Sequence, residues 1–243
     1  MLEAKELFKS FGKVAAVRGV SFTAGNGQIT GLLGPNGAGK STTLRMLYTV
    51  LKPDAGDALI DGTSVMSDPL AARRAMGVLS HGAGVYSNLT ARENILYFGE
   101  LHGLTREDRE ARAAELIEQL EMQPFADRRA KGFSQGQKLK TALARALVHR
   151  PRNLLLDEPT NGLDVMAVRN LRKLLVQLRD AGHCVLFSSH VMQEVEHLCD
   201  EVVVISGGEV VAAGGLEEIR ARAGNTRLED AFVSLMDSSE HKP

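Results

Sequence analysis

The chain has 243 residues, of which 44% are hydrophobic and 24% are charged, a composition that is typical of a globular protein and excludes a disordered one. With 29 basic and 30 acidic residues the formal net charge is -1, so we expect no nucleic-acid partner. The first residues are charged where a signal peptide is apolar, and no window is apolar enough to cross a membrane, which predicts that the chain itself stays in the cytosol.

Short apolar runs alternate with helical patterns along the chain, which predicts an α/β protein with a mostly parallel sheet. Short segments that alternate between apolar and polar residues predict an antiparallel β edge layer at 4–9, 14–23 and 58–61. The core strands should be buried on both faces and show little alternation; we expect them at 28–33, 76–79, 153–156, 184–187 and 201–205. Cys184 and Cys199 lack a C-x-x-C spacing, so we interpret both as buried thiols.

Between residues 88 and 130 the pattern is wholly helical. Thr90-x-x-Glu93 is a capping box that begins one helix, and Thr105 precedes an amphipathic segment at 106–120. No internal repeat, linker or low-complexity tract interrupts the chain. We therefore predict one domain that carries a helical insertion.

Residues 34–42 read GPNGAGKST and contain the pattern G-x-x-x-x-G-K-[ST], placed between an apolar run and a helical segment at 42–51. Glycines let backbone N–H groups turn toward phosphate oxygens, and the helix N-terminus adds a partial positive charge. A glycine-rich turn without function is the alternative, and it matches by chance in about one chain of this length per hundred. The flanking pattern favours nucleotide binding, with Lys40 on the β- and γ-phosphates and Ser41 on Mg²⁺. The expected nucleotide-binding residues are Gly34, Pro35, Asn36, Gly37, Ala38, Gly39, Lys40, Ser41 and Thr42.

An apolar strand that starts at Asn153 ends in two carboxylates, Asp157 and Glu158. In open α/β sheets ligands gather at the carboxyl ends of the strands. We expect Asp157 to face Mg²⁺, which takes one or two carboxylates at phosphate sites, and Glu158 to accept a proton from the attacking water or to orient it. A strand that simply ends in solvated acids is the alternative, and the phosphate loop upstream disfavours it.

Ser134-Gln135-Gly136-Gln137 begins the helical segment 138–148, and Ser-x-x-Gln is a capping box. Gly136 removes a side chain from the first turn, so another molecule can approach the helix end closely. A helix N-terminus with a hydroxyl and a bare backbone is an anion site. From the residues alone two interpretations stay open: simple capping, or contact with a nucleotide that another molecule holds.

Residues 133–137, FSQGQ, resemble the LSGGQ signature of the ATP-binding-cassette (ABC) ATPases and lie, as in that family, between the phosphate loop and the acidic strand. The resemblance covers nearly the whole chain and implies a P-loop ABC cassette fold with ATP and Mg²⁺ as cofactors. It implies one domain, 1–243, with a nucleotide-binding core at 1–87 and 150–223, a helical subdomain at 88–149 and a short tail at 224–243. It also implies a head-to-tail dimer with a second copy, whose in-trans ATP contacts are Ser134, Gln135, Gly136, Gln137 and, in the D-loop stretch, Asp164.

The resemblance gives roles to three further side chains. His190 follows another apolar strand and matches the switch histidine that contacts the γ-phosphate, so the expected catalytic residues are Glu158, His190 and Lys40. Phe11 falls where the family has an aromatic ring under the adenine, with packing of that ring on the core as the alternative. His81 stands at the Q-loop position, where the family usually has glutamine. Imidazole suits Mg²⁺ less well than an amide oxygen, so we expect His81 to act through a water or by its position.

The stretches 84–94 and 147–166 are similar to the NatA-type ATPases of sodium-efflux ABC exporters, and the ending 228–233 resembles the tail of that group. This implies a subunit that powers a separate transmembrane permease from the cytoplasmic side of the membrane, meeting it around residues 82–100, with sodium as cargo. Export of a drug, lipid or polysaccharide stays open, because substrate choice belongs to the permease. A soluble ABC ATPase acting on ribosomes or DNA is disfavoured, since such relatives carry two cassettes or long coiled coils. A small-molecule kinase would leave the signature without a purpose.

Overall fold

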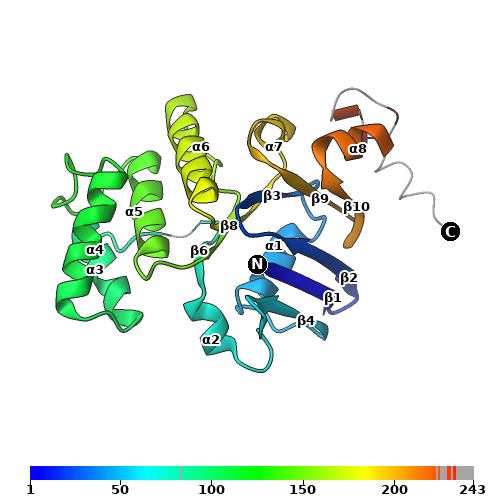
Figure 1. Cartoon of the computed structure of the whole chain (residues 1–243), viewed down its shortest axis with the longest axis horizontal. Helices are drawn as coiled ribbons and strands as arrows, with labels where there is room; N and C mark the ends of the chain where they lie inside the picture. The colour runs from blue at the N-terminus through cyan, green and yellow to red at the C-terminus, as the bar shows by residue number, and fades with distance from the viewer. Residues whose placement is uncertain (83, 223, 225–228, 231, 234–243) are drawn as a thin grey trace.

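The strands form two sheets (Figure 1) in the computed structural model, which describes residues 1–82, 84–222, 224, 229–230 and 232–233. The four-stranded sheet is antiparallel, in the order β2-β1-β4-β5, and the six-stranded sheet has the order β10-β9-β3-β8-β7-β6. In the second sheet all neighbours are parallel except β10 and β9. The strands are β1 (Leu2–Phe11), β2 (Val14–Ala24), β3 (Gln28–Leu33), β4 (Ala55–Ile60), β5 (Thr63–Ser64), β6 (Met76–Leu79), β7 (Asn153–Asp157), β8 (Cys184–Ser189), β9 (Glu201–Ser206) and β10 (Glu209–Gly215).

The predicted α/β fold, a mostly parallel core sheet beside an antiparallel β layer, is confirmed. All five expected core strands are present as β3, β6, β7, β8 and β9. The sequence does not predict β5, which has two residues, or β10, whose alanines and glycines have low β propensity. Pairing with β9 keeps β10 extended at the edge of the sheet.

Helices cover both faces of the parallel sheet, because successive strand residues point to opposite sides. Leu154 and Leu156 of β7 pack in one hydrophobic cluster with the helices around α6, whereas Leu155 packs in a second cluster with α1 and the antiparallel sheet. The two cysteines are buried and free, as predicted. The helices are α1 (Lys40–Leu47), α2 (Pro69–Arg74), α3 (Ala91–Leu101), α4 (Arg106–Gln119), α5 (Gln135–Leu147), α6 (Val165–Asp180), α7 (Met192–Leu198) and α8 (Leu216–Arg222).

Helices α3, α4 and α5 form the lobe at the left of Figure 1. An isolated β-bridge joins Thr90, just before α3, to Arg129. The Thr90 capping box is present, since Thr90 Oγ1 accepts from the Glu93 backbone N–H at 3.0 Å. Thr105 caps α4 in the same way, through the Asp108 backbone N–H at 3.1 Å. The tail predicted at 224–243 lies almost entirely outside the described residues.

The helix after the phosphate loop differs from its predicted bounds, 42–51. It begins at Lys40, because Gly39 leaves the helical region with a φ of 105°, and it ends at Leu47, because Thr49 has a φ of 65°. Lys40 and Ser41 therefore lie in its first turn. That position directs the free N–H groups of the helix end toward the loop.

Candidate functional site

The phosphate loop connects β3 to α1 and closes against neighbouring backbone. A Cβ atom on Gly34 would lie 2.3 Å from the carbonyl oxygen of Ile205, and one on Gly39 would lie 2.5 Å from that of Ala16. Gly39 also needs its positive φ of 105°. Glycine is thus required at both positions by the fold of the loop itself.

Lys40 lies inside this loop and is 4% exposed. Its Nζ donates to the carbonyl oxygens of Gly34 at 2.7 Å and Pro35 at 3.0 Å. Burial lowers the pKa of Lys40, while the carboxylates of Glu158 and Asp157 act in the opposite direction. The ammonium group is therefore held at the centre of the loop, within the field of both acids.

Ser41 and Asp157 form a site that fits a hard cation. Asp157 is 2% exposed, and its Oδ1 accepts hydrogen bonds from Ser41 Oγ at 3.0 Å and Ser188 Oγ at 2.8 Å. Its Oδ2 is buried and has no hydrogen-bond partner among the described residues. A buried carboxylate oxygen without a partner is costly unless a cation or a water completes it. A carboxylate and a hydroxyl are also the oxygen donors that Mg²⁺ prefers.

Glu158 follows Asp157 and turns out of the sheet with a φ of 49°, an uncommon value for a residue with a side chain. Its backbone N–H donates to Ser188 Oγ at 3.0 Å, so one hydroxyl fixes both acids. Its side chain is 15% exposed, and its carboxylate oxygens lie 3.3 Å from His190 Nδ1 and 3.8 Å from His81 Nδ1. Asn161 Nδ2 lies 3.5 Å from the same carboxylate.

The sequence did not identify Ser188, nor the polar network that Glu194 forms with Thr160 and Ser189. Glu194 is 8% exposed, and its Oε2 accepts from Thr160 Oγ1 and Ser189 Oγ, both at 2.8 Å. The serines directly before His190 were the available signal for the first residue. Glu194 gave no signal, because an acid in an amphipathic helix usually faces water.

The signature begins α5 as expected. Ser134 is its N-cap, accepting from the Gln137 backbone N–H at 3.2 Å, and the Gln137 side chain accepts from the Ser134 N–H at 3.1 Å. A Cβ on Gly136 would meet only Ala167, at 3.7 Å. Asp164 caps α6 by accepting from the Ala167 N–H at 2.8 Å, and it lines the same 400 Å³ groove as Ser134, Gly136 and Gln137.

The residues predicted for the ATP site lie in separate places on the chain. Asp157, Glu158 and His81 line a cavity of about 370 Å³, which Gln135 enters from the start of α5. Ser134, Gly136, Gln137 and Asp164 line the separate groove beside it. Phe11 ends β1 and is 49% exposed, and Lys9 Nζ lies 5.9 Å from the centroid of its ring.

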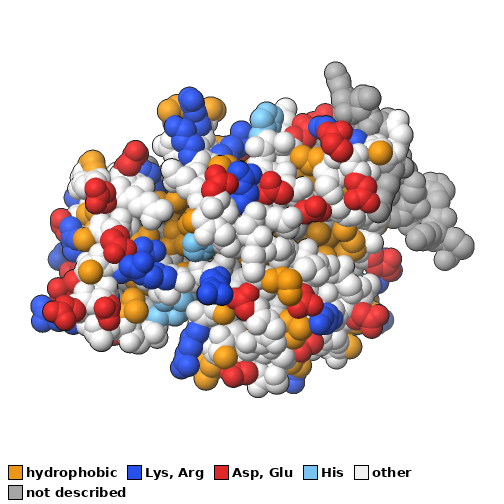
Figure 2. All heavy atoms as spheres, viewed as in Figure 1, with side chains coloured by type: hydrophobic (Ala, Val, Ile, Leu, Met, Phe, Trp, Pro, Cys, Tyr) orange, Lys and Arg blue, Asp and Glu red, His pale blue; other side chains and the backbone are white. Residues whose placement is uncertain are grey.

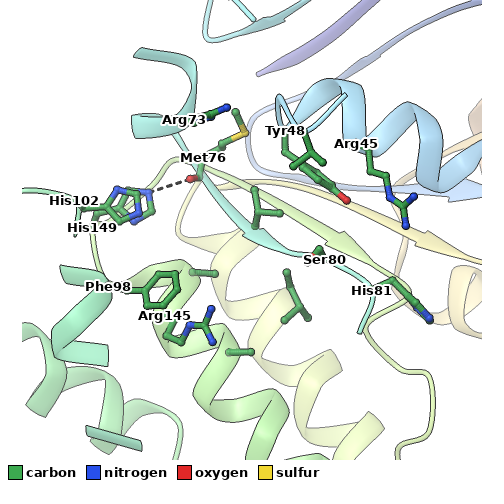
Figure 3. Close-up of a pocket in the computed structure, with 15 residues that line it drawn as sticks. Arg45, Tyr48, Arg73, Met76, Ser80, His81, Phe98, His102, Arg145 and His149 are labelled. Carbon is green, nitrogen blue, oxygen red and sulfur yellow. Dashed lines mark hydrogen bonds between the residues drawn. The ribbon is translucent and has the colours of Figure 1, made fainter. Parts of the chain in front are cut away.

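A third groove, of about 550 Å³, lies between the core and the helical lobe (Figure 3). There the rings of His102 and His149 stack 3.6 Å apart at 4°, and His149 Nε2 lies 3.0 Å from the carbonyl oxygen of Met76. Burial, followed by the neighbouring His102, lowers the pKa of His149 to about 4. Figure 2 shows pale-blue histidine side chains at the surface between the helical lobe and the core. Acidic and basic side chains are intermixed on this face.

Among the described residues, no helix combines the length and apolar character needed to cross a membrane. The family model described as ABC transporter matches residues 17–161. The ABC transporter ATP-binding protein NatA of Bacillus subtilis (strain 168) is 42% identical over 92% of this chain and 91% of its own length. The linearmycin resistance ATP-binding protein LnrL of the same organism is 36% identical, over 96% of this chain and 75% of its own. The daunorubicin/doxorubicin resistance ATP-binding protein DrrA of Streptomyces peucetius is 38% identical, over 95% and 71%.

Solved structures agree with these relatives. The ATP-binding subunit of an ABC transporter superposes with a TM-score of 0.88 at 28% identity, over 97% of this chain and 99% of that one. A dimeric ATP-binding cassette in a post-hydrolysis state, bound to ADP and phosphate, superposes with a TM-score of 0.79 at 28% identity, over 89% and 99%. This chain belongs to the ABC transporter family, as an ATP-binding subunit with ATPase activity.

Proposed function

We propose that the chain hydrolyses ATP at the cytoplasmic face of a membrane to drive export through a separate permease. The observation that carries the catalytic part is the arrangement at the end of β7. There a buried carboxylate with one unpartnered oxygen lies beside the Ser41 hydroxyl, and the next residue is a second carboxylate. A metal-binding acid followed by an acid free to take a proton is what phosphoryl transfer to water requires.

Each group has a separate task in this proposal. Lys40 and His190 bind the γ-phosphate, and Glu158 accepts the proton of the attacking water. Mg²⁺, when bound with ATP by Ser41 and Asp157, supplies charge neutralisation on the phosphates. Ser188 holds the two acids in place through its two hydrogen bonds. Phe11, which is 49% exposed, would stack its ring on the adenine.

The ATP-bound form is proposed to be a head-to-tail pair of chains. In support, the helix end at Ser134 is capped, yet Gly136 beside it is not needed by its own chain, since a Cβ there would meet only Ala167 at 3.7 Å. Bare backbone at a helix N-terminus suits the phosphates of a nucleotide that another copy holds. Solved dimers of similar cassettes also support the pairing.

Replacement of Glu158 by glutamine tests the catalytic part. Glu158→Gln keeps the shape but cannot accept a proton, so we expect ATP to bind with unchanged affinity while turnover falls at least about 100-fold. ATP hydrolysis and equilibrium binding of ATP are measured on the same preparation. Normal turnover in this variant would remove Glu158 from the role of base.

Sodium is the proposed cargo, and similarity to NatA supports it. Export of a drug is the second candidate, because similar chains include the drug-resistance proteins LnrL and DrrA. The two are separated with vesicles that contain this chain and its proposed permease. ATP-dependent ²²Na⁺ movement that stops with Glu158→Gln supports sodium, and movement of an anthracycline without ²²Na⁺ movement supports the second candidate.

A further inference from the structure

We propose that His81 is a positioning residue for the catalytic carboxylate, holding Glu158 from the side opposite His190, and that it does not act on the metal. The inference rests on the proposed role of Glu158 as the base. It assigns a specific partner to the imidazole that replaces the glutamine usual at this position.

The sheet places the three side chains next to one another. The final rung between β6 and β7 joins Leu79 to Leu156, so His81 and Glu158 each lie two residues beyond the same rung. Strand β8, on the other side of β7, leads directly into His190. Adjacent strands are about 4.8 Å apart, and the histidines therefore leave the sheet on either side of the glutamate.

The contacts follow this placement. His190 Nδ1 lies 3.3 Å from Glu158 Oε1, and His81 Nδ1 lies 3.8 Å from Glu158 Oε2. Each oxygen of the carboxylate thus faces a different imidazole. The Glu158 side chain is only 15% exposed, so the groups packed around it restrict where its carboxylate can turn. His81 Nδ1 at 3.8 Å makes a close approach rather than a hydrogen bond, and Asn161 Nδ2 lies 3.5 Å from the same oxygen.

The metal site offers His81 no comparable contact. Among the described side chains, the hydrogen bonds of Asp157 come from Ser41 and Ser188, both to Oδ1. The His81 nitrogen nearest to an acid points instead at Glu158. Imidazole is also a weak ligand for Mg²⁺.

A purely structural role for His81 is the competing explanation. His81 lines the cavity of about 370 Å³ and also the groove of about 550 Å³ between the core and the helical lobe. At the edge of that groove its ring points away from the His102–His149 pair (Figure 3). Its side chain is 50% exposed, so truncation creates no buried cavity. A structural role would therefore show itself in nucleotide binding or stability, whereas a positioning role would show itself in turnover.

Three variants of the full chain separate these roles. His81→Ala removes the imidazole beside Glu158, and we expect kcat for ATP hydrolysis to fall at least about tenfold, with KM for ATP changed less than about twofold. His81→Gln restores an N–H donor and should recover most of the loss. His197→Ala is the matched control, because His197 is an exposed imidazole on α7 whose Nδ1 lies 2.6 Å from the carbonyl oxygen of Gln193 in its own helix. It should leave kcat unchanged.

The Mg²⁺ concentration for half-maximal activity completes the experiment, and we expect it to be equal in the parent and His81→Ala. A rise in that concentration would place His81 on the metal and overturn the inference. Unchanged kcat in His81→Ala would overturn it too. Glu158→Gln is measured in parallel: if it lacks turnover while His81→Ala is normal, only the inference fails, and if it turns over normally, the proposed base fails.

Discussion

Glycines at the start of α1 and at the start of α5 have different surroundings in this chain. At the start of α1, Gly34 and Gly39 approach neighbouring backbone so closely that any side chain would collide within the same chain. At the start of α5, Gly136 has only Ala167 near it. The glycines of the first loop are explained by contacts within the chain. The space beside Gly136 is open, and the proposed pairing would place the other copy's nucleotide there.

The largest expected effect is at the first loop. Gly34→Ala puts a methyl group 2.3 Å from the Ile205 carbonyl oxygen, and the backbone must move to relieve the collision. We expect a loss of about 3 kcal/mol in the free energy of unfolding. Urea unfolding measures it. Equal stability of variant and parent would mean that this loop is less constrained by its own fold than the comparison states.

The next largest expected effect concerns His149, which lines the groove between the core, with its phosphate loop, and the helical lobe, with α5. The pKa of His149 is about 4 in the folded chain and about 6.5 when unfolded, so between these values the unfolded state binds more protons and stability falls as pH falls. The free energy of unfolding is therefore not reduced by this histidine above about pH 7. From pH 7 to pH 5 we expect it to fall by about 2 kcal/mol.

Urea unfolding at both pH values measures this loss, and His149→Gln should remove that part of the pH dependence. The amide can still donate to the Met76 carbonyl oxygen but does not titrate. An unchanged pH dependence in the variant would assign the effect to other groups.

Gly136→Ala addresses the second loop directly. The added methyl meets Ala167 at an ordinary 3.7 Å, and alanine favours a helix, so stability should stay equal or rise by up to about 1 kcal/mol. Pairing of two copies in ATP should weaken at least about tenfold, because the methyl fills the space for the other copy's nucleotide. Sedimentation with ATP, in a Glu158→Gln background that prevents turnover, measures the pairing. Undiminished pairing would favour simple capping.

The smallest effect separates capping from phosphate contact at Ser134. Ser134→Ala removes the N-cap and should cost about 1 kcal/mol of stability. Ser134→Asp keeps a cap of similar quality but brings a negative charge to the proposed triphosphate site. We expect the aspartate variant to unfold like the parent and yet to lose ATP-dependent pairing. Parallel losses in both assays would leave Ser134 with capping alone.

The parts of this molecule that the sequence predicts well are those fixed by local rules. The core strands, the capping boxes at Thr90 and Ser134, and the phosphate loop follow from apolar runs and short patterns. The serines before His190 marked Ser188 only as a nearby polar residue, because its contact with both acids depends on the pairing of β7 with β8. Glu194 could not be found from local rules, because its partners come from another loop and from the end of β8. The contact of His81 with Glu158 likewise depends on the register of β6 against β7.

Glu194 ties two loops to a single atom. Its Oε2 accepts both Thr160, from the loop that leads to α6, and Ser189, the last residue of β8, and Ser189 also receives the backbone N–H of Val191. A shift of the loop that carries Thr160 would therefore change the hydrogen bonds of Glu194, including the one from Ser189. Thr160, Glu194 and Ser189 thus form one hydrogen-bonded chain, which joins the loop before α6 to the residue that precedes His190.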